Sequence, residues 1–358
     1  MRKRLVLALM VILVSLSACV NKNAGSTQSS DVYKGTEGIV MNFMPSMPPS
    51  QIYSSDTLNF NLEIRNKGTY DAGTVPNNKE GPYKKFLKFY VSGYDKSILT
   101  GKKEGGSIDP IFDKWLFWEA ELEGKSEFNP QGGIVYKDFS TKIGTLPEGM
   151  DSFRTNFLLT ACYTYETLAV SSVCIDPVPY STVTREKACT VSDVSLSGGQ
   201  GAPVAVTKIE EEASKGKARF KIYFENKGNG KIFDMTHNRD DIAKSGRSAL
   251  DSDGVIRLKC NPYSEKGLGY GDIDKIKLNK ILIGGDVASN DITDSCKPVI
   301  VNEKGHKIVR LIDGRGFIIC EKGDLTGTSA YTTPIEINVA YGYTNSIQKE
   351  IEILKIPE

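Results

Sequence analysis

One short segment occurs twice in the chain, and each copy ends a run in which apolar and polar residues alternate. In the first run the apolar positions are Leu58, Phe60, Leu62 and Ile64, and in the second they are Phe220, Ile222 and Phe224. Asn66-Lys67-Gly68 follows the first run and Asn226-Lys227-Gly228 follows the second. Alternation at period two predicts a β-strand with one buried face. Each half of the chain must therefore bury such a strand in a sheet.

A second pair of matching segments lies near the end of each half. Ala161-Cys162-Tyr163-Thr164-Tyr165 is similar to Ala340-Tyr341-Gly342-Tyr343-Thr344, and a proline-containing segment from residue 176 to about 187 separates the halves. The chain is also long enough for two cores of ordinary domain size. We therefore expect two homologous domains, at residues 36–180 and 188–358.

The composition favours strands over helices. The chain has 34 glycines and 16 tyrosines, and its Val, Ile, Thr and Phe residues fall in short runs, which predicts an all-β fold. Lysine plus arginine number 45 against 44 acidic residues, so the basic excess that nucleic-acid binding requires is missing. We expect no nucleic-acid partner.

Further strands are predicted in the first half at residues 39–43 and 87–91. The segment 115–123 favours a strand in its second half, with Trp115 and Trp118 in the core rather than on an exposed sugar-stacking surface. A last pair of strands, 157–163 and 170–175, is predicted as a hairpin with its turn around Glu166.

The Asn-Lys-Gly segments resemble the segment that follows strand B in secreted immunoglobulin-like β-sandwich modules, such as the CARDB-like repeats of archaeal and bacterial surface proteins. The resemblance covers both halves as an architecture and about a dozen residues as a motif. It implies two tandem immunoglobulin-like β-sandwiches that serve adhesion, presentation or spacing. The Cys…Trp…Cys spacing of antibody domains is missing, so the resemblance implies no particular class of receptor.

The first residues resemble the signal peptide of a prokaryotic lipoprotein. Residues 2–4 are basic, residues 5–16 are apolar, and Leu16-Ser17-Ala18-Cys19 ends the run. The apolar run is shorter than the roughly 20 residues of a membrane-spanning helix. The resemblance implies removal of residues 1–18, acylation of Cys19, and anchoring in the bilayer on the extracytoplasmic side of the cell membrane or outer envelope. Residues 19–35 are polar and predict a flexible tether.

Six further cysteines predict three disulfides in such an oxidising compartment: Cys162, Cys174, Cys189, Cys260, Cys296 and Cys320. Because the predicted hairpin brings them opposite each other, we expect Cys162 to pair with Cys174. Three pairings are open for the other four cysteines. Cys260 with Cys320 is favoured because both end apolar strands, which leaves Cys189 with Cys296.

The sequence shows no catalytic or metal-binding pattern. It has no Cys-x-x-Cys, His-Glu-x-x-His or Gly-x-Ser-x-Gly, and its only histidines, His237 and His306, lie far apart. Asp251-Ser252-Asp253-Gly254 begins like a calcium loop, but the twelfth position is Pro262, so a tight turn is predicted. We expect neither a metal nor a cofactor.

These observations favour a non-catalytic binding, adhesion or envelope-scaffolding protein. Its partner would be an unidentified envelope or extracellular protein or glycan, contacted through the two long polar loops at 69–83 and 229–253. The alternative is an accessory or divergent part of an envelope polysaccharide-processing enzyme.

Overall fold

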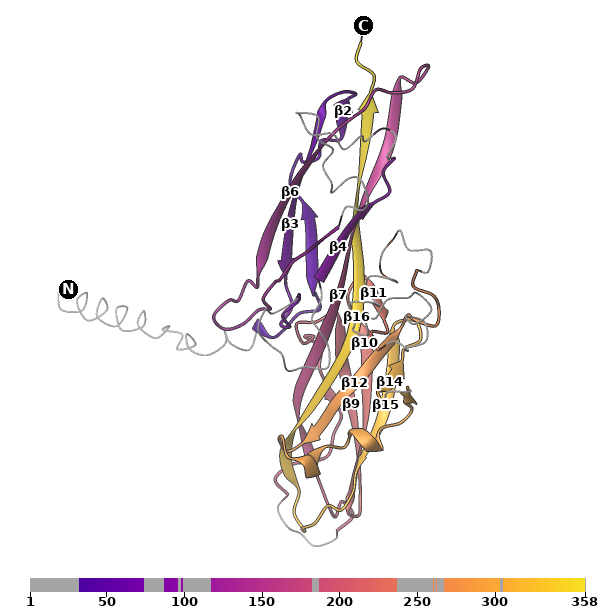
Figure 1. The fold of residues 1–358 in the computed structure, drawn as a ribbon. Helices are drawn as coiled ribbons and strands as arrows, with labels where there is room; N and C mark the ends of the chain where they lie inside the picture. The colour runs from indigo at the N-terminus through magenta and orange to yellow at the C-terminus, as the bar shows by residue number, and fades with distance from the viewer. Residues whose placement is uncertain are drawn as a thin grey trace, which may run out of the picture.

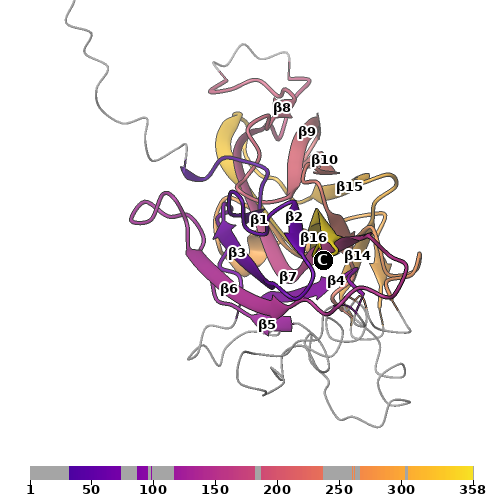
Figure 2. The ribbon, with the colours of Figure 1, turned by 90° about the horizontal axis from the view of Figure 1, so that it is seen from above.

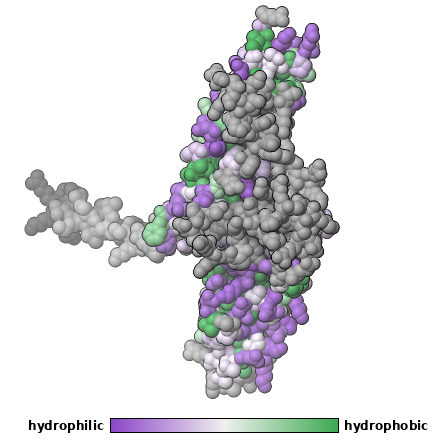
Figure 3. All heavy atoms as spheres, in the orientation of Figure 1, coloured by the Kyte–Doolittle hydropathy of each residue, from purple (hydrophilic) through white to green (hydrophobic). Residues whose placement is uncertain are grey.

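The computed structural model describes residues 32–73, 87–95, 98, 117–181, 187–236, 260, 262, 267–302 and 305–357. These residues form antiparallel sheets with almost no helix, as predicted. The described part is elongated (Figure 1). Hydrophilic residues gather on the lower part of the face shown in Figure 3, over the second of two sandwiches described below.

Two strands run the length of the molecule. β7 (Ser152–Ile175) and β16 (Tyr331–Leu354) each have 24 residues and pair antiparallel along their whole length. Tyr331 lies opposite Ile175, Leu354 lies opposite Ser152, and the register does not shift between these ends. Figure 1 shows the pair as the central axis around which the other strands are arranged.

The first sandwich combines one half of this pair with the early strands. β1 (Ile39–Phe43), β3 (Thr57–Asn66) and β6 (Ile134–Lys142) form a small sheet in the order β1-β3-β6. β4 (Leu87–Ser92) pairs with the first half of β7, β5 (Phe117–Glu119) pairs with β4, and β2 (Gln51–Tyr53) pairs in parallel with the end of β16. The two layers meet in an aromatic core.

That core confirms the predicted place of Trp118. Its ring stacks on Phe89 at 5.0 Å, and Phe60 of β3 meets Phe157 of β7 at 4.5 Å between ring centroids. Such aromatic contacts add to the gain from burying apolar area. Trp115 lies outside the described residues.

The second sandwich uses the other half of the long pair. Its small sheet has the order β15-β10-β9-β8, formed by Arg315–Lys322, Lys217–Asn226, Val204–Ser214 and Val194–Ser195. On the long sheet β12 (Lys275–Ile283) pairs with β16, followed by β14 (Lys307–Arg310) and β13 (Ile300–Val301). β11 (Lys231–Phe233) pairs with the middle of β16.

Both small sheets pack on one face of the long pair. Phe157, Tyr163 and Thr167 all contact them, and odd-numbered residues of a regular strand share a face. Viewed from above in Figure 2, the two small sheets are rotated relative to each other about β7 and β16, as the twist of a long sheet requires.

This arrangement corrects two predictions. The segments 157–163 and 170–175 are not a hairpin, because β7 runs through Glu166 without a turn. No Gly, Pro or Asn lies between residues 163 and 170 to make one. The boundary between 36–180 and 188–358 separates the repeats along the sequence but not in space, since β7 and β16 each begin in one sandwich and end in the other.

The sequence repeat corresponds to an approximate two-fold axis between Thr164 and Gly342, which lie opposite each other. The hydroxyl of Tyr163 accepts a hydrogen bond from the Ile39 N–H at 3.2 Å, and that of Tyr341 accepts one from Val204, also at 3.2 Å. Equivalent contacts thus join the long strands to both small sheets.

The Asn-Lys-Gly segments take part in the same arrangement. Tyr165 donates a hydrogen bond to Asn66 Oδ1 at 2.9 Å, and Tyr343 donates one to Asn226 Oδ1 at 3.1 Å. A Cβ at Gly68 would lie 1.9 Å from the Tyr165 hydroxyl, so only glycine fits there. The repeated motif therefore joins the layers of each sandwich.

All six cysteines form disulfides, but every predicted pairing is wrong. The bonds are Cys162–Cys260, Cys174–Cys189 and Cys296–Cys320. Cys162 and Cys174 lie on the same strand, twelve residues and therefore about 40 Å apart. Cys260 does not bond Cys320 because it bonds Cys162 of β7. Cys189 does not bond Cys296 because it bonds Cys174, which also lies on β7.

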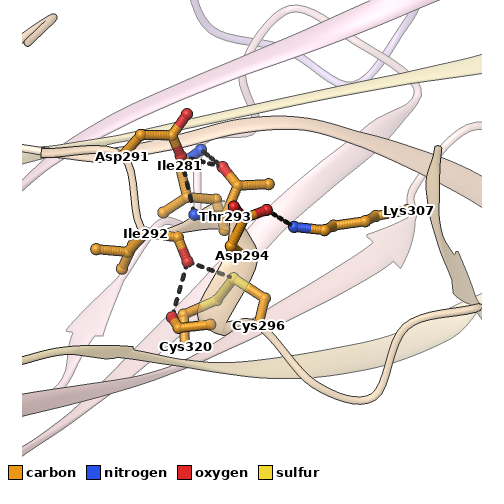
Figure 4. A network of polar contacts seen from close by, with 9 residues as sticks. Ile281, Asp291, Ile292, Thr293, Asp294, Cys296, Lys307 and Cys320 are labelled. Atoms are coloured by element: carbon orange, nitrogen blue, oxygen red, sulfur yellow. Dashed lines mark hydrogen bonds and ion pairs between the residues drawn. A yellow bond between two sulfur atoms is a disulfide. The ribbon is translucent and has the colours of Figure 1, made fainter. Parts of the chain in front are cut away.

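The third disulfide lies beside a network of polar contacts in the second sandwich (Figure 4). It follows a short 3₁₀ turn, η3 (Thr293–Ser295), and reaches Cys320 on β15. The Thr293 hydroxyl accepts the Ile281 N–H of β12 at 2.8 Å and donates to Asp291 at 2.5 Å, while Lys307 of β14 pairs with Asp294. This turn therefore links β12, β14 and β15.

Candidate functional site

Several predicted site residues lie outside the described part of the chain. These are Cys19 with the signal segment 1–18, most of the tether 19–35, His237, the Asp251–Gly254 segment, and most of the loops 69–83 and 229–253. The predictions made for them stay predictions. His306 is described, and its N–H donates to Asn302 Oδ1 at 2.9 Å.

Within the described ranges, no group of three or more His, Cys, Asp or Glu side chains is placed to hold a metal ion. Among the same residues, we find no helix with the length and apolar character needed to cross a membrane.

A candidate site lies along the edge of β7, and the hydrogen bonds at the end of the long pair show which backbone groups point there. The Glu352 N–H donates to Ser50 O at 2.9 Å, on the side of β16 away from β7. The Lys355 N–H donates to Asp151 O at 2.9 Å, across the pair. Because antiparallel pairs alternate and the register is unbroken, even-numbered residues of both strands direct their N–H and C=O groups outward.

On β7 this alternation places backbone groups of Leu168, Val170 and Ser172 at the outer edge. β4 covers that edge only as far as Tyr163, and no strand in the described ranges pairs with it further along. The Cys174 N–H confirms the direction, because it donates outward to Glu211 Oε2 at 3.1 Å. β7 thus has an open edge of about five residues, a feature that most soluble proteins cover or protect with charge.

This open edge forms one side of a groove of about 760 Å³. Leu168, Val170 and Ser171 line it from β7, and the segment Ser195–Gln200 lines it from the opposite side. Tyr33 also lines it. Leu168 is 50% exposed and Val170 is 57% exposed, so two apolar side chains face solvent in the groove. Ligand sites commonly combine such apolar walls with a few polar groups.

The polar groups lie at the end of the groove nearest the two-fold axis. Glu166 accepts a hydrogen bond from the Tyr70 hydroxyl at 3.1 Å and one from the Asn338 amide at 3.3 Å. Burial and the neighbouring Glu166 carboxylate raise the pKa of Tyr70, so this hydroxyl stays protonated. Burial lowers the pKa of Lys277 to about 8, with the charge of Glu166 acting in the opposite direction.

A second hollow, of about 430 Å³, lies near Tyr180 and Lys215. Its other amine, Lys187, already pairs with Asp176 at 2.5 Å and donates to Pro179 O at 3.2 Å. We interpret these contacts as structural, because they hold the segment that leads to Cys189.

The sequence prediction did not find the groove. The sequence predicts that Val170 begins the second strand of a hairpin, and the first strand of that hairpin would cover its edge. The one sequence feature that bears on the groove is the lack of Gly, Pro and Asn between residues 163 and 170. That absence predicts a continuous strand, but not which edge of it stays open.

Comparison with known proteins gives little to set beside this geometry. No protein-family model matches the chain, and no curated protein matches it. Among solved structures, Escherichia coli alpha-2-macroglobulin activated by porcine elastase matches over 90% of this chain with 10% identity and a TM-score of 0.15. This chain spans 22% of the length of that one. A likeness at this level carries no argument about fold or function.

Proposed function

We propose that this protein is a lipid-anchored, extracytoplasmic binding protein without catalytic activity, built from two immunoglobulin-like β-sandwiches of the CARDB-like kind. Acylated Cys19 holds it in the bilayer, where two or more acyl chains anchor stably and one does not. The bound partner is an envelope or extracellular protein or glycan. The groove along β7 is the contact surface.

One observation carries the binding role: the groove exposes Leu168 and Val170 beside outward backbone groups at an otherwise regular sheet. A strand edge of this kind favours self-association, so soluble proteins usually shield it. An apolar edge that no strand of the described residues covers is understandable if a partner covers it.

The anchor is tested by Cys19→Ser, which we expect to release the protein from the membrane fraction into the soluble one. Detergent partitioning and cell fractionation measure this. If the variant stayed with the membrane as fully as the wild type, the anchor would be wrong.

The contact surface is tested with the mature chain carrying Cys19→Ser, measured for binding to purified envelope material. Leu168→Lys with Val170→Lys should weaken binding at least tenfold. Ser346→Lys with Gln348→Lys is the matched control, since these residues lie at the equivalent positions of β16. No binding by the parent protein would overturn the binding role, and equal binding by both variants would overturn the groove as its surface.

The alternative of a polysaccharide-processing accessory has one observation in its favour, the cluster of Glu166, Tyr70 and Asn338 in the groove. Carboxylate, hydroxyl and amide groups can also contact sugar hydroxyls. Release of reducing sugar from envelope polysaccharide by the mature chain would favour this alternative over a binding role.

A further inference from the structure

We infer that the groove along β7 binds an extended, uncharged peptide segment of another protein, which adds to the long sheet as one further strand. This inference rests on the proposed binding function and names the class of partner. Four properties of the groove lead to it.

The first property is the direction of the backbone groups. Leu168, Val170 and Ser172 present N–H and C=O groups outward at every second residue, a spacing of about 6.6 Å. An extended polypeptide has donors and acceptors at the same repeat, so it pairs with all of them at once. A glycan or a compact small molecule does not have that repeat.

The second property is the pattern of side chains beside the edge. Leu168 and Val170 lie on one face of the strand, two residues apart, and both are about half exposed. Leu196 lines the groove from the opposite side. A bound strand would place alternate side chains next to this apolar pair, so the peptide should have apolar residues at every second position.

The third property is charge. The lining has one carboxylate, Glu166, and one lysine, Lys34. Both oxygens of Glu166 already accept hydrogen bonds from Tyr70 and Asn338, and the remaining lining groups are uncharged. Because the lining carries one charge of each sign, a charged peptide would lose hydration without a net attraction to offset that loss. The complementary peptide is uncharged.

The fourth property is size. The groove that the open edge and the segment Ser195–Gln200 help to line has a volume of about 760 Å³, and it runs beside the open stretch of about five residues. A second copy of this chain would have to bring its own β7 edge together with its own Ser195–Gln200 segment, so a free peptide segment fits better than a second copy.

The test uses two proline variants at equivalent positions. Val170 lies six residues beyond Thr164, and Gln348 lies six residues beyond Gly342, the pair at the two-fold axis. Both direct their N–H away from the long pair, so proline removes an outward donor without breaking the β7–β16 ladder. Val170→Pro should abolish peptide binding, and Gln348→Pro should leave it unchanged at a similar cost in stability.

The probe is a phage-displayed library of random seven-residue peptides, selected on the mature Cys19→Ser protein. We expect enrichment of uncharged sequences with alternating apolar residues, and at least a tenfold weaker Kd for the synthetic peptides on Val170→Pro than on Gln348→Pro. N-methylation at alternate backbone nitrogens of the peptide should weaken binding in one phase of alternation and not in the other.

Several outcomes would overturn the inference. These are no enrichment over the Val170→Pro protein, equal Kd values for the two proline variants, or insensitivity to N-methylation in both phases. Peptide-free protein that is dimeric as wild type and monomeric as Val170→Pro would show that a second copy occupies the edge. Binding to envelope material that persists in Val170→Pro would sink only the peptide inference, whereas the absence of any envelope binding would sink the proposed function itself.

Discussion

The outer edges of β7 and β16 are equivalent by the internal two-fold axis, yet they differ in what they expose. On β7 the outward positions beyond the axis are Leu168, Val170 and Ser172, and on β16 they are Ser346, Gln348 and Glu350. The β16 edge is polar and is covered at its far end by β2. The backbone is thus the same at both edges, and only the side chains distinguish a protected edge from one suited to a partner.

The two strands also differ in their covalent ties. β7 carries two half-cystines, Cys162 and Cys174, whereas no cysteine occurs in β16. Cys162 ties the middle of β7 to Cys260 in a small second cluster with Tyr90 and Phe233. The strand with the open edge is therefore the one held more firmly at its position.

The largest expected effect comes from removing that central tie. The Cys162–Cys260 bond closes 98 residues, so Cys162→Ala with Cys260→Ala should lower the free energy of unfolding by about 4 to 5 kcal/mol on the chain-entropy estimate. The Cys174–Cys189 bond closes a loop of 15 residues, so Cys174→Ala with Cys189→Ala should lower the free energy of unfolding by about 3 kcal/mol. Urea unfolding measures both, and a larger loss for the shorter loop would contradict the ranking.

A pH effect is expected at the end of β7. Burial raises the pKa of Glu211 to about 7, although the Cys174 N–H opposes this, and the second carboxyl oxygen has no hydrogen-bond partner among the described residues. The folded state therefore holds a proton that the unfolded chain loses near pH 4.5. Stability should fall by about 3 kcal/mol as the pH rises from 4.5 to 7, and then level off.

Glu211→Gln tests this effect because it keeps a neutral group at the same place. The variant should show little change in the free energy of unfolding between pH 5 and 8, and should exceed the wild type in stability at pH 8. Glu350→Gln on the exposed part of β16 is the control and should follow the wild-type profile. A wild-type profile that is flat across the same range would refute the assignment to Glu211.

A smaller effect compares the two asparagines of the repeated motif. Asn66 is fully buried and accepts from Tyr165 and from the Gly68 N–H, while its amide donates to Tyr70 O and Leu122 O. Asn66→Ala leaves several of these buried groups unpaired, so we expect a loss of about 3 kcal/mol.

The equivalent asparagine has fewer partners. Asn226 accepts from Tyr343 and donates to Gly230 O, and it is partly exposed to water. Asn226→Ala should therefore cost about 1 kcal/mol, measured by thermal and urea unfolding beside Asn66→Ala. Equal losses at the two sites would show that burial does not distinguish the two copies of the motif.

Much of the fold follows from local pattern, because alternation depends only on neighbouring residues. Thr57–Asn66 and Lys217–Asn226 are strands as their period predicts, and the Tyr163 and Tyr341 segments are equivalent, as their similarity suggested. The strand crossing between sandwiches was not predictable in this way. It depends on whether β7 turns at Glu166 or continues, and the partner that decides this, β16, lies more than 150 residues away.

The disulfide pairing was predicted wrongly and the groove was not predicted, and both errors have the same cause. A hairpin with its turn at Glu166 would make Cys162 and Cys174 neighbours and would cover the edge at Val170. Edge position is a property of the assembled sheet, so no local pattern shows which backbone groups stay unpaired. The exposed apolar pair Leu168 and Val170 becomes meaningful only when the sheet order is known.

The smallest effect on stability should come from exchanging the apolar side chain at the β7 edge and the polar one at the β16 edge. This exchange tests the comparison of the two edges most directly. Val170→Thr removes apolar surface from an exposed position and Gln348→Val adds it at the equivalent one, so each should change the free energy of unfolding by less than about 0.5 kcal/mol. Association should change far more. Gln348→Val places an apolar side chain at an exposed position of the β16 edge, so it should raise concentration-dependent self-association in analytical ultracentrifugation. Val170→Thr should lower any such association of the parent. If Gln348→Val stayed as monomeric as the parent, apolar character would not be what makes an open edge available, and the backbone groups of β7 alone would have to account for binding.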